Sequence, residues 1–158
     1  MEFYTVKKQP KTRLKQLKLS LESAKSHIEI HIDGASRGNP GRSGVGVLMR
    51  DVDGSIREIR RDIGIATNNE AEYEALITAL QSAKELKKNH LKIYTDSSLL
   101  ANQINGNWRV RDPKIAVLYK RAKELISEFE QVKVHYIPRE LNRDADRLAN
   151  EAIDKYNT

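Results

Sequence analysis

The chain has 158 residues, of which 39% are hydrophobic and 32% are charged, a balance typical of a globular domain and unlike that of a disordered chain. No apolar run approaches the roughly 18 residues of a membrane-spanning helix, and the first residues lack the apolar core of a secretory signal. The absence of cysteine excludes disulfides, thiol nucleophiles and thiolate zinc sites. We therefore expect a cytoplasmic monomer, with no membrane association and no obligate protein partner.

The net charge of +6 is concentrated at the N-terminus. Residues 1–26 contain seven basic and two acidic residues, a net charge of +5. Such a segment suits a polyanionic partner such as nucleic acid, although a solvated tail that aids solubility explains it equally well. Residues 11–26 have helix-forming composition with scattered leucines, which predicts a basic amphipathic helix. We expect a basic, partly helical extension over residues 1–26 and a globular domain over residues 27–158.

Three strands are predicted first, as an antiparallel meander. Residues 27–33 (HIEIHID) alternate strictly between isoleucine and polar residues, and a glycine-rich turn is expected directly after Asp33. The second and third strands are predicted over residues 45–50 and 55–65, with Asp53-Gly54 as the hairpin turn between them.

Helices and strands then alternate. Asn68 or Asn69 can cap the clearest helix, Ser97 or Ser98 the next, and Asp112-Pro113 is typical of a third helix start. The predicted ranges are helix 67–88, strand 91–96, helix 97–104, helix 112–129, strand 132–137 and helix 142–156. The order β-β-β-α-β-α-α-β-α indicates an α/β fold with a mixed sheet and helices on its faces.

Four carboxylates stand where a purely structural pattern does not favour them. Asp33 and Asp96 end predicted strands, Glu72 falls on the apolar stripe of its helix, and Asp146 lies in the first turn of the last helix. Gathered at one sheet edge they would repel, and hard divalent cations such as Mg²⁺ or Mn²⁺ remove that repulsion, as in two-metal phosphodiester hydrolysis. Taken singly, each has a structural alternative: a strand-end turn residue for the two aspartates after strands, and a favourable charge at a helix N-terminus for the other two.

Four segments, in order, resemble the motifs of the type 1 ribonuclease H family: IDGASRGNPGRSGVGVLM, TNNEAEYEALITAL, YTDSSLL and IPRELNRDADRLANEA. The resemblance covers roughly residues 28–155. It implies a ribonuclease H-like fold, with a five-stranded mixed sheet (three antiparallel strands, then two parallel ones) and helices on both faces. It also implies a metal-dependent endonuclease that hydrolyses the RNA strand of RNA/DNA hybrids and leaves 5′-phosphate and 3′-hydroxyl ends.

The same resemblance assigns roles to particular residues. Two Mg²⁺ ions, or Mn²⁺, would be held by the catalytic carboxylates Asp33, Glu72, Asp96 and Asp146. The backbone near the scissile phosphate would sense the 2′-hydroxyls of the RNA strand, and Thr67 would bind a DNA phosphate. The substrate contacts implied are Gly34, Ala35, Ser36, Asn39, Thr67, Asn68, Asn69 and Ser98.

Two departures from the family pattern stand out. Many members carry a histidine in a mobile loop before the last aspartate, whereas this chain reads IPRELNR, so Arg139 or Glu140 is the available substitute. This form resembles the subgroup from archaea and some bacteria that lacks the histidine. The basic, Trp-rich protrusion of some members is reduced to NGNWRVRDPK. We expect its Trp108 to be a core residue, with packing against a nucleotide sugar as the alternative.

The main alternative is a hybrid- or double-stranded-RNA-binding domain on the same fold that has lost catalysis. Such a domain would lack a carboxylate, and none is missing. Another metal nuclease of the superfamily is disfavoured by the TNN and GNPG motifs. The four histidines are too scattered for a zinc site, and we expect His31 to be an ordinary strand residue.

Overall fold

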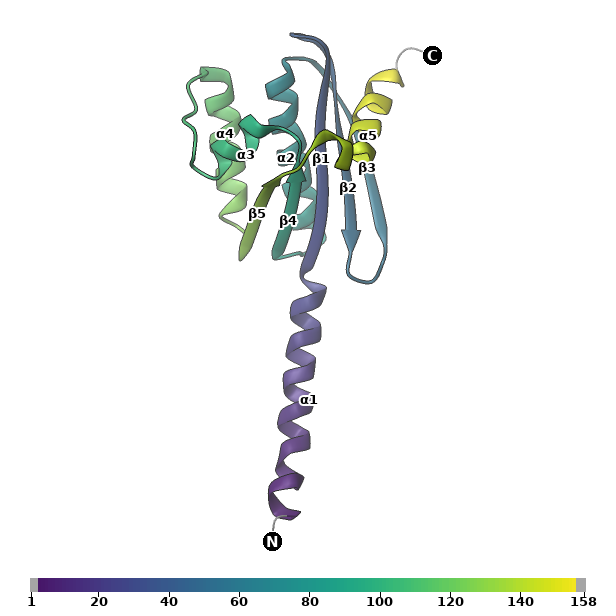
Figure 1. The fold of residues 1–158 in the computed structure, drawn as a ribbon, viewed down its shortest axis with the longest axis vertical. Helices are drawn as coiled ribbons and strands as arrows, with labels where there is room; N and C mark the ends of the chain where they lie inside the picture. The colour runs from purple at the N-terminus through teal and green to yellow at the C-terminus, as the bar shows by residue number, and fades with distance from the viewer. Residues whose placement is uncertain (1–2, 156–158) are drawn as a thin grey trace.

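The computed structural model describes residues 3–155, and its centre is a five-stranded sheet in the order β3-β2-β1-β4-β5 (Figure 1). The antiparallel pairs are β1 with β2 and β2 with β3, while β4 runs parallel to both β1 and β5. The strands are β1 His27–Gly38, β2 Gly41–Asp51, β3 Ile56–Ala66, β4 His90–Thr95 and β5 Gln131–Tyr136. The predicted mixed sheet is therefore confirmed.

Helices cover the two faces of the sheet unequally (Figure 1). On one face α2 (Asn68–Glu85) packs on β1 and β2, and α4 (Pro113–Ile126) packs on α2. On the other face α5 (Arg143–Asp154) packs on β1, β2 and β3. The short helix α3 (Ser98–Ile104) follows β4, and one 3-10 turn (Arg139–Leu141) joins β5 to α5. The main core lies between the sheet and α2, where Ile30, Ile32, Leu76, Leu80 and Ile93 are fully buried.

Strand β1 does not end at Asp33, as the sequence suggested. It continues to Gly38 and stays paired with β2, Gly34 opposite Val45 and Gly38 opposite Gly41. The turn lies instead at Asn39–Pro40, which is a cis peptide. The expected turn directly after Asp33 is wrong because small residues in both strands let helices pack close without breaking the ladder. Asp33 is consequently a mid-strand residue.

The N-terminal cap of α2 differs from the sequence prediction, and α2 and α4 each end three residues before the predicted 88 and 129. Thr67, not Asn68 or Asn69, caps α2: its hydroxyl accepts from the Glu70 N–H at 3.1 Å, and the Glu70 carboxylate accepts from the Thr67 N–H at 3.0 Å. This reciprocal pair satisfies two N–H groups that the first turn leaves free.

The starts of α3, α4 and α5 match the prediction. Ser97 caps α3, and Asp112, followed by Pro113, caps α4. The last helix begins after Asn142 and ends at Asp154, and Tyr156, the predicted end, lies outside the described residues.

Helix α1 (Phe3–Lys25) projects from the end of the sheet where β1 begins (Figure 1). It starts earlier than the predicted residues 11–26, and its leucines 14, 17, 19 and 21 are 55–60% exposed. Within residues 3–155, no helix is both long and apolar enough to span a membrane.

Candidate active site

Three of the four predicted carboxylates meet in the middle of the sheet. Asp33 comes from β1, Glu72 from the second turn of α2, and Asp96 from the residue after β4. One oxygen of each lies within 4.8 Å of the others, and Asp33 and Glu72 are only 5% and 4% exposed. Buried carboxylates at this separation repel one another strongly.

Two glycines bring these elements together. A side chain on Gly34 would collide with the backbone of Ala71 and Glu72, so only glycine lets α2 pack directly on β1. The Gly34 N–H then donates to Glu72 Oε1 at 3.1 Å and orients that carboxylate. On the opposite face Gly46, paired with Asp33, admits the backbone of α5 at Ala145 in the same way.

The electrostatics of the cluster favour a bound cation. Burial, and then the neighbouring negative charge of Glu72, raises the pKa of Asp33 well above its usual range. Burial likewise raises the pKa of Glu72 and of Asp96. Glu72 Oε2 is buried and has no hydrogen-bond partner among the described residues. An all-oxygen ligand set with an unsatisfied oxygen fits a hard divalent cation.

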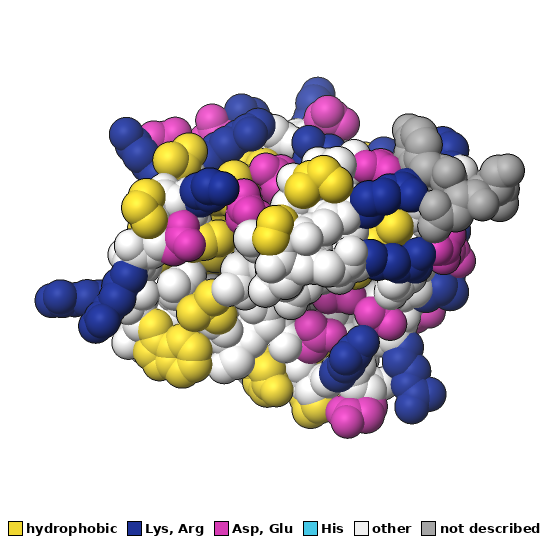
Figure 2. Space-filling model, turned by 90° about the horizontal axis from the view of Figure 1, so that it is seen from above, with side chains coloured by type: hydrophobic (Ala, Val, Ile, Leu, Met, Phe, Trp, Pro, Cys, Tyr) yellow, Lys and Arg dark blue, Asp and Glu magenta, His cyan; other side chains and the backbone are white. Residues whose placement is uncertain are grey.

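Asp146 stands at the side of this cluster, on α5. It lines the same cleft, of about 340 Å³, and Asn150 Nδ2 donates to its carboxylate at 3.3 Å. The other residues that line the cleft are Asp33, Gly34, Ala35, Ser36, Asn68, Glu72, Asp96, Arg139 and Asn150. Viewed from the end opposite α1, acidic side chains lie among Lys and Arg side chains on the surface (Figure 2).

Asn142 is a site residue that the sequence analysis missed. It is 1% exposed, and its Nδ2 donates to the Ile32 carbonyl at 2.9 Å and to Asp96 Oδ2 at 3.4 Å. It therefore ties the start of α5 to β1 and to a carboxylate of the cluster. The signal in the sequence was an asparagine directly before a helix, which is ordinarily interpreted as a cap; here its side chain makes no capping hydrogen bond.

The predicted substrate residues divide between two pockets. Gly34, Ala35, Ser36 and Asn68 line the carboxylate cleft. A second pocket has a volume of about 440 Å³. One hydrogen bond joins the linings of the two pockets: Asn39 Oδ1, in the second pocket, accepts from the N–H of Asn68, in the cleft, at 3.0 Å. The lining of the second pocket includes Asn39, Thr67, Asn69, Arg109 and Arg111.

Ser98 lines neither pocket. It is exposed, and its carbonyl accepts from Asn102 Nδ2 at 2.8 Å. Trp108 is 48% exposed, so the expectation that it belongs to the core is wrong. Trp108 lies in the connection between α3 and α4.

Arg139 reaches the cleft from the connection between β5 and α5. Its guanidinium lies 3.9 Å from Asp146 Oδ1, and its side chain is 80% exposed. Of the two candidates for the missing loop histidine, it is Arg139 that lines the cleft.

Residues 31–152 match the sequence profile of a family described as reverse transcriptase-like. The ribonuclease H of Chlorobium phaeobacteroides is 36% identical over 143 residues, which cover 80% of this chain and 94% of that protein. The crystal structure of ribonuclease H1 from the archaeon Halobacterium salinarum is 42% identical with a TM-score of 0.79, covering 82% of this chain and 98% of that one. The chain belongs to the type 1 ribonuclease H family.

The family's fold and metal dependence agree with the geometry of the cluster. LC11-RNase H1, 36% identical with a TM-score of 0.78 over 83% of this chain and 99% of that one, was solved in complex with an RNA/DNA hybrid. The chain spans about a third (35%) of the length of the mycobacterial relatives that it matches at 41% identity.

Proposed function

We propose that this chain is an endonuclease that hydrolyses the RNA strand of RNA/DNA hybrids and leaves 5′-phosphate and 3′-hydroxyl ends. The observation that carries the proposal is the meeting of three carboxylates from three elements, within 4.8 Å, in a cleft beside a basic pocket. The hybrid complex of the related LC11 enzyme supports the choice of substrate.

The carboxylates Asp33, Glu72, Asp96 and Asp146 would hold two Mg²⁺ ions, with Mn²⁺ as the alternative metal. When bound, such ions lower the pKa of the attacking water and stabilise the leaving oxygen. The chain's own contribution is orientation: the Gly34 N–H fixes Glu72, Asn142 fixes Asp96, and Asn150 fixes Asp146. Holding ligands in place before the substrate arrives removes reorganisation from the chemical step.

The two linked pockets suit the two strands of a hybrid. The RNA strand would lie in the cleft, where the backbone of Gly34, Ala35 and Ser36 can sense 2′-hydroxyls. A DNA phosphate would enter the second pocket, where Thr67 stands with Arg109 and Arg111. A duplex that occupies both pockets at once needs one strand with 2′-hydroxyls and one strand that deforms readily. This requirement accounts for the selectivity for RNA/DNA hybrids.

The test is cleavage of one labelled sequence presented as RNA/DNA hybrid, double-stranded RNA, single-stranded RNA and duplex DNA, with Mg²⁺ and with chelator. Cutting of the hybrid's RNA strand alone, lost on chelation, is the expected result. Tight binding of the hybrid without cutting would contradict the proposal and would indicate a binding domain that has lost catalysis.

A further inference from the structure

Within residues 3–155, no helix covers one half of one sheet face. Helix α5 packs on β1, β2 and β3, and on the same side β4 and β5 stand uncovered (Figure 1). Because side chains alternate along a strand, every second residue of β1, β4 and β5 points out from this open face. These residues form transverse rows, set by the parallel register of the three strands.

The row nearest the carboxylates is aromatic. His31, Tyr94 and His135 are register partners, and their rings stack with centroids 4.8 Å and 5.5 Å apart and planes inclined by 27° and 28°. The row ends at His135, which is exposed on the edge strand β5. The outer face of that ring is the position where a further flat ring can extend the stack.

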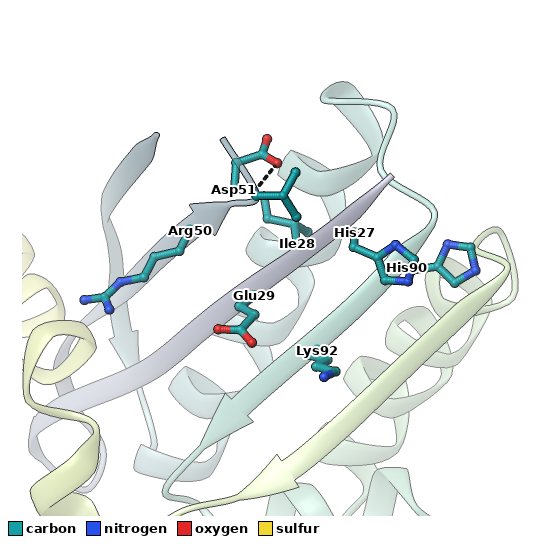
Figure 3. A pocket seen from close by; sticks show the side chains of 8 residues that line it. His27, Ile28, Glu29, Arg50, Asp51, His90 and Lys92 are labelled. Atoms are coloured by element: carbon teal, nitrogen blue, oxygen red, sulfur yellow. Dashed lines mark hydrogen bonds between the residues drawn. The ribbon is translucent and has the colours of Figure 1, made fainter. Parts of the chain in front are cut away.

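The next rows are basic and then aromatic again. Exposed Lys92 and Lys133 are neighbours in register, and beyond them the rings of His27 and His90 stack at 4.3 Å and 13°. Figure 3 shows Glu29, Lys92, His27 and His90 projecting from the same face of the sheet. Glu29 is the acidic member of these rows, and Arg50, which faces it from β2, also pairs with Asp144 at 3.5 Å. Lys92 and Lys133 therefore supply the positive charge of the face.

This face is continuous with the active site. His31 precedes Asp33 by two residues on the same side of β1, and Tyr94 precedes Asp96 by two residues. Two residues of strand span about 7 Å. At the other end the rows reach Lys25, the last residue of α1, whose carbonyl accepts from Lys88 Nζ at 2.6 Å.

We give the name exit track to the part of the open face formed by His31, Tyr94, His135, Lys92 and Lys133. We propose that the exit track binds an unpaired stretch of the RNA strand where this strand leaves the carboxylate cleft. Aromatic rings can stack only on bases that are not already paired, and lysines at intervals neutralise phosphates, which is how single strands are bound on sheets. The bound strand is assigned as RNA because the proposed function places a phosphate of the RNA strand at the carboxylates. The inference therefore rests on the proposed function.

The experiment compares three substrates that share one hybrid duplex: blunt, with a single-stranded RNA overhang, and with a DNA overhang of the same sequence. Affinities are measured by fluorescence anisotropy in chelator, so that nothing is cut. The proteins are wild type, His135→Ala, Lys92→Ala/Lys133→Ala, and Lys120→Ala as a matched control on α4, an element of the opposite face.

The RNA overhang should tighten binding by wild type about fivefold or more, as expected from stacking of one base. That gain should disappear in His135→Ala and in the double lysine variant, while blunt-hybrid affinity stays constant and Lys120→Ala behaves as wild type. An overhang without effect, or a gain that survives both variants, would overturn the exit track, and an equal gain from DNA would overturn its assignment to RNA. Cleavage of the blunt hybrid with Mg²⁺, run in parallel, tests the proposed function separately.

Discussion

At the scale of single residues, the two buried carboxylates oppose folding of the metal-free protein. Asp33 and Glu72 are almost wholly buried, and burial raises the pKa of both. Their folded-state pKa values lie above the unfolded ones, so between those values the folded chain binds more protons than the unfolded chain. Stability of the metal-free protein should therefore fall as the pH rises above about 4.

Replacing Asp33→Asn should remove much of this penalty, because a neutral amide of the same shape is buried at lower cost. The variant should melt at a higher temperature than wild type in chelator at neutral pH, with a weaker decline as the pH rises. Mg²⁺ should raise the melting temperature of the wild-type protein, because an ion that binds the folded state stabilises it. The same ion should hardly change the melting temperature of the variant, which has lost a metal ligand. Cleavage should be lost. Thermal melts and a hybrid-cleavage assay measure both effects, and an active variant would contradict the metal assignment.

Arg139 is the second residue whose role can be isolated. Its exposed pairing with Asp146 contributes only about 0–1 kcal/mol to stability. We expect Arg139→Ala to keep the melting temperature but to lower kcat on the hybrid roughly tenfold, because the variant loses a cation that lines the cleft where the phosphate would bind. Steady-state kinetics test this, with Arg143→Ala, an exposed arginine at the start of α5, as control. Equal kinetics of the two variants would leave Arg139 without a role in turnover.

At the scale of elements, the site depends on how closely α2 and α5 approach β1 and β2. Gly46→Ala should push α5, and with it Asp146, away from the sheet, since the new methyl group would meet the α5 backbone at Ala145 and Ala149. Overpacking of this kind costs roughly 1–3 kcal/mol. Activity should fall further than the loss of folded protein explains.

The control for that variant is Gly54→Ala, in the turn between β2 and β3. An added methyl group there meets nothing within 4 Å, although the backbone φ of 88° imposes some strain. Denaturation curves and specific activity per folded molecule distinguish the two variants. If both retained activity equally, close packing of α5 would not be what positions Asp146.

At the scale of the whole molecule, α1 is a basic arm that leaves the sheet at the start of β1 (Figure 1). Deleting residues 1–26 should raise the KM for the hybrid and flatten its dependence on salt, because phosphate contacts released with counterions set that slope. The comparison is a salt series of KM for the full chain and for residues 27–158, after circular dichroism has shown equal folding. Unchanged KM and slope would mean that the extension only solubilises the protein.

Residue patterns alone predicted the order of strands and helices, the family and four candidate carboxylates, three of which meet in the structure. Each of these follows from local patterns: alternation in residues 27–33, the apolar stripe that contains Glu72, and short motifs around Asp96 and Asp146. Such patterns act over a few residues, which is why they can be recognised without a structure.

Which residues meet could be seen only in the folded chain. It placed Asp33 inside a strand, gave Asn142 a contact with Asp96, and left Ser98 outside both pockets. These outcomes depend on contacts between residues far apart in the chain, such as Gly46 with Ala145. The local period of a strand or helix says which way a side chain points but not which distant element packs against it, and the packing of α5 on one half of the sheet alone is what leaves β4 and β5 open.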